Sequence, residues 1–145
     1  MHTASDNDIQ HNRKLLDRLA HVIPKIVDAF DPDEIILFGS YARGEAEPYS
    51  DVDLLIIVED IKLRFQDRSL RALDVVKDRD HDHIMCISPF VYTKDELKIM
   101  LEQKESFLIS ALEESILVWK KAKSTDVERQ LEYKEIDSDF KTYLN

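Results

Sequence analysis

The sequence predicts an α/β (α+β) fold in which a mixed β-sheet of about four strands is backed by helices. The first observation is a pair of short, almost wholly apolar runs, Glu34–Phe38 and Leu54–Val58, which predict strands buried on both faces. The second is the alternation of such runs with longer segments whose apolar residues recur every three or four positions, as in amphipathic helices. The predicted order is helix, strand, short helix, strand, helix, strand, helix, strand.

The composition is that of a soluble globular protein. A chain of 145 residues suits one domain, which buries roughly two-thirds of the surface of its unfolded chain. The net charge of −10 argues against nonspecific nucleic-acid binding, which needs a basic surface, so we expect no direct contact with nucleic acid. A nucleotide that arrives with Mg²⁺ remains compatible, because the metal reverses the local sign of charge.

The single cysteine and the N-terminus indicate the compartment. Cys86 lies in an apolar run and is expected to be a buried structural thiol, which fits a reducing environment. The N-terminus has neither the basic start nor the apolar core of a signal peptide, and no apolar run has the length of a membrane span. We therefore expect a cytoplasmic protein with no membrane partner.

The domain is expected to extend over residues 9–119. Residues 1–8 are polar and predict a flexible N-terminus, and residues 9–29 predict an amphipathic helix. Pro24 falls inside this helix and is expected to kink or split it. The segment Asp31–Asp33, which contains a proline, predicts the turn into the first strand.

The candidate site lies between the first two predicted strands. Gly39 and Gly44 are the two glycines of the chain, and both fall in this connection. Asp51 and Asp53 stand at the start of the second strand, where a period of two puts both carboxylates on one face, roughly 7 Å apart along the backbone. Val52 between them is expected to point into the core. Two poorly solvated like charges are destabilising unless a cation lies between them, so the pair predicts a metal site.

Ser40 and Arg43 are the other candidates in this connection. Ser40 is predicted to begin a short helix, where its hydroxyl and the free backbone N–H groups could hold phosphate, or where it could act only as an N-cap. Arg43 could stabilise phosphate charge or pair with Glu45 or Glu47. The sequence leaves both choices open.

Further elements follow towards the C-terminus. Residues 62–77 predict a long helix, 84–87 a strand and 106–114 a short helix; a final strand is predicted over 116–119. Thr93 and Glu96 form a capping box that starts another helix. The histidine–aspartate run 78–83 has no helical spacing of histidines and no second cysteine, so a zinc site is not expected. Residues 120–145 are charged and sparse in apolar residues, and fit a docking helix or a partner-binding tail.

The motif carries a family resemblance. Gly39-Ser40, ten residues and then Asp51-Val52-Asp53 resemble the pattern of the DNA polymerase β-type nucleotidyltransferases, and most of all their minimal members, many of which act as antitoxins beside a helical HEPN-domain toxin. The resemblance covers residues 33–119. It implies transfer of AMP from ATP to a hydroxyl, with a tyrosine of a HEPN-type toxin as acceptor. It also implies Mg²⁺ on Asp51 and Asp53, and binding of the nucleotide by Gly39, Ser40 and Arg43.

The resemblance further implies a third carboxylate at the start of the third strand, facing the aspartate pair. Counting back from Ser88 and Pro89, the expected position holds His83, with Asp82 next to it. Strand alternation puts these two side chains on opposite faces, so one of them faces the site. Asp82 would add a third metal ligand and assist deprotonation of the nucleophile. His83 would be a base without negative charge.

Two rival functions stay open. One is a non-catalytic or weakly catalytic antitoxin of the same fold that neutralises its partner by contact, which the uncertain third acid favours. The other is a nucleotidyltransferase that modifies a small molecule. The acceptor, the nucleotide base and self-association into a homo-oligomer are not determined by the sequence.

Overall fold

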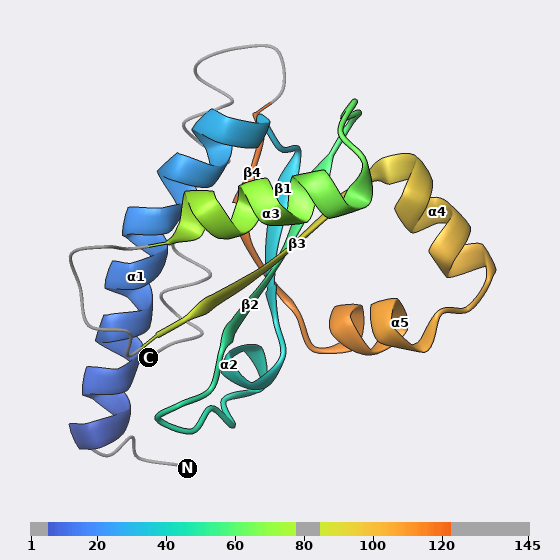
Figure 1. Ribbon diagram of the computed structural model, residues 1–145. Coiled ribbons are helices and arrows are strands. Elements are labelled where there is room, and N and C mark those ends of the chain that lie inside the picture. The colour runs from blue at the N-terminus through green and yellow to red at the C-terminus, as the bar shows by residue number, and fades with distance from the viewer. Residues whose placement is uncertain (1–5, 78–84, 123–145) are drawn as a thin grey trace.

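The computed structural model describes residues 6–77 and 85–122, with side chains from residue 13 onward (Figure 1). Nine helices and strands occur in these ranges. They are α1 (Asp6–Phe30), β1 (Glu34–Phe38), α2 (Ser40–Arg43), β2 (Val52–Val58), α3 (Phe65–Val76), β3 (Ile87–Thr93), α4 (Lys94–Glu102), α5 (Ser106–Glu113) and β4 (Ile116–Lys120). Their order is the predicted one; the helix after the capping box is α4 and the short helix predicted over 106–114 is α5.

The sheet has four strands in the order β3-β2-β1-β4. Strand β1 pairs antiparallel with β2 and with β4, whereas β2 and β3 pair parallel. The parallel pair needs a crossover, and α3 provides it between β2 and β3. The predicted mixed sheet backed by helices is confirmed.

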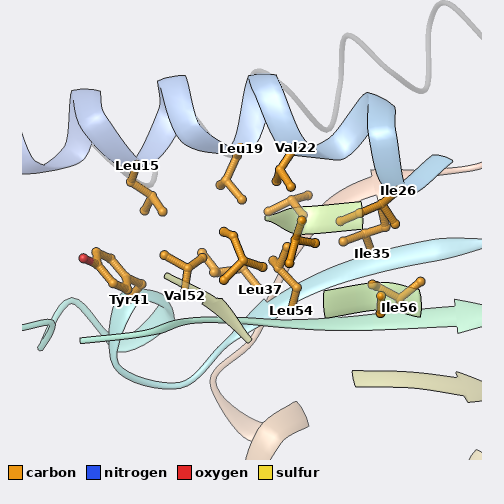
Figure 2. Packing of buried hydrophobic residues seen from close by; sticks show 14 of the residues in the cluster. Leu15, Leu19, Val22, Ile26, Ile35, Leu37, Tyr41, Val52, Leu54 and Ile56 are labelled. Carbon is orange, nitrogen blue, oxygen red and sulfur yellow. The ribbon is translucent and has the colours of Figure 1, made fainter. Parts of the chain in front are cut away.

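One face of the sheet is covered by α1 and α3, and the core lies between them and the strands. Figure 2 shows α1 directing its buried side chains onto alternate residues of β1 and β2. Burying each such leucine or isoleucine contributes about 1.5–3 kcal/mol. The cluster includes Leu15, Leu19, Val22 and Ile26 of α1, Ala72 and Val76 of α3, and Leu37, Val52, Leu54 and Ile56 of the sheet.

The opposite face packs against α4 and α5, which Figure 1 places on the far side of the sheet from α1. The intervening residues of the strands point this way, so β1 and β2 are buried on both sides, as their apolar runs predicted. The second cluster consists of Ile36, Phe38, Leu55, Ile57, Leu97, Leu108 and Ala111.

Pro24 was expected to kink or split the first helix, and the prediction of a split is wrong. Helix α1 is continuous from Asp6 to Phe30 with Pro24 inside it, and it begins before the predicted residue 9. A proline removes one backbone hydrogen bond and leaves a carbonyl one turn earlier without its donor. Pro24 and Ala20, whose carbonyl is affected, are both exposed, so water can satisfy that carbonyl.

The third strand was predicted too early in the chain. It was expected over residues 84–87, but β3 is Ile87–Thr93, so Ser88 and Pro89 lie inside it. A proline is tolerated there because β3 is an edge strand, where a missing N–H need not disturb the sheet. Cys86 lies just before β3 and is exposed, so the prediction of a buried thiol is also wrong.

The predicted capping box is confirmed and is joined to a buried arginine. The Thr93 hydroxyl accepts from the Glu96 N–H at 3.1 Å, and the Glu96 carboxylate accepts from the Thr93 N–H at 2.8 Å. Arg68 of α3, only 6% exposed, donates to Glu96 and to the carbonyls of Leu63 and Val91. Arg68 therefore links α3 to β3 and to the start of α4.

No helix in the described ranges combines the length and apolar character needed to cross a membrane.

Candidate active site

The sheet brings the two halves of the motif together. Strands β1 and β2 are antiparallel, and Phe38 at the end of β1 lies opposite Asp53 at the start of β2. Gly39 and Ser40 follow Phe38 directly, so they lie at the same end of the two strands as Asp51 and Asp53. In Figure 1, α2 lies at this end of the two strands.

Gly39 is packed against the carboxylate of Asp53. Its backbone has φ 76° and ψ −156°, a region that is essentially restricted to glycine. A Cβ atom at this position would lie 2.2 Å from Asp53 Oδ2 and 3.2 Å from its Cγ. The site therefore requires glycine both for its backbone conformation and for the space that the carboxylate occupies.

The two aspartates differ in environment. Asp51 is exposed, whereas Asp53 is half-buried and lies on the face of the sheet opposite the α1 core. Burial raises the pKa of Asp53, and the charge of Asp51 raises it further, while Arg43 acts in the opposite direction. Burial and the charge of Asp51 also raise the pKa of Tyr41, whose ring lies beneath Leu15 in Figure 2. A cation at the pair would relieve this accumulated negative charge.

Hydrogen bonds of the flanking residues fix the backbone on both sides of Asp51. In the preceding turn, the Ser50 N–H donates to Glu47 O at 3.0 Å and the Ser50 hydroxyl accepts from the Glu47 N–H at 2.8 Å. Val52 is fully buried between the aspartates, as predicted, and its N–H donates to Cys86 O at 2.8 Å. The backbone at the pair is thus tied to the segment that enters β3.

Ser40 begins α2, as predicted, but it is not the N-cap of that helix. The N-cap is Gly39, whose carbonyl accepts from the Arg43 N–H at 3.2 Å, and no side chain caps the helix. The N-cap interpretation of Ser40 is therefore wrong, and its half-buried hydroxyl is not required to close the first turn. Gly44 ends the helix in the left-handed conformation, with φ 71°.

Arg43 lies at the last turn of α2 and pairs with Glu45. Its Nε atom is 3.2 Å from Glu45 Oε2, and both side chains are exposed. An exposed pair of this kind contributes little to stability and is easily exchanged for another anion. Since Arg43 also lowers the pKa of Asp53, its charge acts at the candidate site.

Ser88 is the neighbour of Asp53 on β3, a position that the sequence interpretation missed. Strand β3 runs parallel to β2 with Asp53 and Ser88 in register, so both side chains lie on the same face. The missed signal was the β-prone run Phe90–Thr93 after Pro89, which extends the strand and places Ser88 within it. Asp82 and His83 lie outside the described residues. Among the residues that are described, no three histidine, cysteine or carboxylate side chains gather into a metal-binding group.

Comparison with known proteins places this chain in the family that the motif suggested. The family model "Nucleotidyltransferase domain" matches residues 19–138. "Putative protein adenylyltransferase MJ0141" of Methanocaldococcus jannaschii is 32% identical over 75 residues, which are 52% of this chain and 74% of that protein. "Putative protein adenylyltransferase MJ1305" of the same organism is 43% identical over 65 residues. That second match spans 45% of this chain and less than half (44%) of the relative.

A solved structure shares the fold. The crystal structure of a putative nucleotidyltransferase from Sulfolobus solfataricus superimposes with a TM-score of 0.60 at 19% sequence identity, over 83% of this chain and 94% of the other. At that identity the likeness concerns the fold alone.

Proposed function

Because the chain belongs to the nucleotidyltransferase domain family, we propose that it transfers AMP from ATP to a protein hydroxyl, with a tyrosine of a HEPN-type toxin as the acceptor. The observation that carries the proposal is the pair Asp51 and Asp53 at the start of β2, with the backbone of Gly39 packed against the second carboxylate. In the reaction, the acceptor oxygen bonds to the α-phosphorus while its proton passes to a base, for which Asp82 or His83 is proposed. The bond to the β-phosphate oxygen breaks, and pyrophosphate leaves.

The donor set fits Mg²⁺. This ion prefers hard oxygen ligands and commonly binds through one or two carboxylates together with substrate phosphates. Asp51 and Asp53 would hold it, and a bound cation would offset the burial and the charge of Asp51 that raise the pKa of Asp53. When bound, the metal would neutralise charge on the triphosphate. Asp82 is proposed as a further ligand, with His83 as its alternative.

The remaining residues of the motif are proposed to bind the triphosphate. The Ser40 hydroxyl, which does not cap α2, would donate to a phosphate oxygen, together with the backbone amides of the turn after Gly39. Arg43 would exchange its exposed partner Glu45 for a phosphate, because a guanidinium binds such oxygens strongly. These contacts hold the departing pyrophosphate while the aspartates stay at the α-phosphate.

The acceptor is proposed from two sources. Two relatives are named as putative protein adenylyltransferases, and the motif resembles the minimal nucleotidyltransferases, many of which pair with HEPN-domain toxins. The net charge of −10 favours a protein over a nucleic acid as the acceptor.

The test is the dependence of nucleotide binding and transfer on the aspartate pair. The double variant Asp51→Asn/Asp53→Asn should lose Mg·ATP affinity in titration calorimetry while it keeps its fold, because like charges are removed. Asp60→Asn, which alters an exposed residue beyond the opposite end of β2, is the matched control. Intact mass spectrometry of a coexpressed toxin should find one added AMP with the parent and none with the double variant. Unchanged Mg·ATP affinity in the double variant would contradict the proposal.

One observation favours a second candidate, a fold-related antitoxin that acts by contact without transfer. The residue of β3 in register with Asp53 is Ser88, which is not an acid. In that case the partner would remain unmodified in the mass spectrum, and the double variant would neutralise it as well as the parent does.

A further inference from the structure

We propose that Phe107 of α5 binds the base of the nucleotide by packing against its flat ring. This inference rests on the proposed function, since it concerns the same site. Phe107 lies outside the Gly-Ser and Asp-Val-Asp motif, and its role is recognition of the nucleoside half of the substrate.

Phe107 belongs to a cluster of three aromatic rings drawn from three elements. Its centroid lies 5.8 Å from that of Phe38 in an edge-on arrangement and 5.4 Å from that of Phe90, and Phe38 and Phe90 are themselves 5.5 Å apart. Each ring therefore contacts the other two. These separations are in the range in which aromatic pairs attract beyond their simple burial.

The cluster adjoins the proposed metal site. Phe38 is the cross-strand partner of Asp53. Phe90 lies two residues after Ser88 on β3, so it shares the face of Ser88, and Ser88 is in register with Asp53. Both rings pack with Leu55 in the α4 and α5 side of the core, which is the face that Asp53 shares. Phe107 contacts both rings, so the aromatic cluster extends from the strand positions that neighbour Asp53.

Phe107 is the most exposed residue of the three. Phe38 is only 7% exposed, whereas Phe107 is 40% exposed, although its neighbour Leu108 is fully buried against the sheet. Two neighbouring rings hold Phe107, so little side-chain freedom is lost when a ligand packs against it. Its exposed surface can thus act as a preformed platform.

The chemistry of the substrate explains why a ring is useful here. The α-phosphate must lie at the aspartates, and the base is joined to that phosphate through the ribose. Aromatic side chains bind bases by stacking, which tolerates any base because every base has a flat face. Phe107 therefore favours a nucleoside triphosphate over a bare polyphosphate, and it does not select among bases.

The experiment compares two ligands that differ only in the nucleoside. Mg·ATP and Mg·tripolyphosphate are titrated into the full chain and into Phe107→Ala, Phe107→Tyr and Ile109→Ala. Ile109 is the matched control, because it lies on the same helix with 37% exposure and outside the aromatic cluster. Phe107→Ala should weaken Mg·ATP binding about 5- to 160-fold, which is the fold-change that corresponds to alanine replacement of a base-stacking aromatic. It should leave Mg·tripolyphosphate unchanged, while Phe107→Tyr and Ile109→Ala keep the parent's affinity for both.

Other outcomes overturn the inference. An equal loss of affinity for both ligands in Phe107→Ala would show a general structural effect. Unchanged ATP affinity with a raised KM for the acceptor protein would assign the ring to the acceptor. Tyr49 lies in the turn before Asp51 and is 94% exposed. If Tyr49→Ala weakens Mg·ATP binding and Phe107→Ala does not, the base packs against Tyr49 instead of Phe107. If Asp51→Asn/Asp53→Asn abolishes Mg·ATP binding while Phe107→Ala does not affect it, the proposed function stands and this inference fails. If the parent itself does not bind Mg·ATP, both fail.

Discussion

Replacing Gly39 with alanine tests the close contact between the two halves of the motif. The added methyl group would lie 2.2 Å from Asp53 Oδ2, well inside van der Waals contact, and the backbone would have to hold φ 76° and ψ −156° with a side chain. Either the Asp53 carboxylate moves or the turn after β1 shifts. Both responses separate the groups that the proposed site needs together.

The expected loss has two parts. Holding a non-glycine residue in this sparsely populated region costs about 1–3 kcal/mol. Forcing the Asp53 side chain away from its rotamer costs about 0.5–1.5 kcal/mol more. We therefore expect Gly39→Ala to reduce the free energy of unfolding by about 2–4 kcal/mol.

Gly44→Ala is the matched control, since this glycine also has positive φ but a Cβ there would meet nothing within 4 Å. It should cost only the backbone term, about 1–2 kcal/mol for the left-handed conformation. Urea denaturation of Gly39→Ala, Asp53→Ala and the double variant then measures their coupling. Removing the carboxylate should return about 0.5–1.5 kcal/mol of the loss in the double variant.

Equal destabilisation of Gly39→Ala and Gly44→Ala, with no coupling between positions 39 and 53 in the cycle, would contradict the close contact of Gly39 with Asp53. Mg·ATP affinity of the folded fraction provides a second measurement. It should fall in Gly39→Ala and stay at the parent's value in Gly44→Ala.

Three further predictions concern charge and hydrogen bonding. Burial and Asp51 raise the pKa of Asp53, so its ionised form is destabilising in the fold; Asp53→Asn should be more stable than the parent at neutral pH. This advantage should shrink as pH falls through the raised pKa and the parent takes up its proton, and a pH-independent difference in urea melts would contradict it. Ser40→Ala should change the free energy of unfolding by less than about 0.5 kcal/mol, because Ser40 does not cap α2. It should nevertheless lower turnover per folded molecule, and unchanged turnover would exclude a phosphate contact. Arg68→Met should lower the free energy of unfolding by about 2–4 kcal/mol in urea denaturation. This is less than the loss of one partner of a fully buried ion pair, because Glu96 is partly exposed. A loss no larger than that of an ordinary surface substitution would contradict the linking role of Arg68.

Local signals in the sequence were enough to predict the framework of the site. The apolar runs of β1 and β2 and the capping box at Thr93 were predictable because each depends on neighbours within a few residues. The spacing from Gly39 to Asp53 was predictable because both ends of the motif lie in one connection between two recognisable strands. Alternation alone places Val52 in the core and both aspartates away from it. These features survive in any fold that keeps the two strands paired.

The tertiary structure decided what depends on partners distant in sequence. Pro24 is accommodated because that side of α1 faces solvent, and Pro89 is accommodated because β3 lies at the edge of the sheet. The contact of Gly39 with Asp53 follows from the antiparallel pairing of β1 with β2, and the place of Ser88 beside Asp53 follows from the parallel register of β3. Strand order and register are set by how all the apolar faces pack at once, and no local window of sequence contains that information.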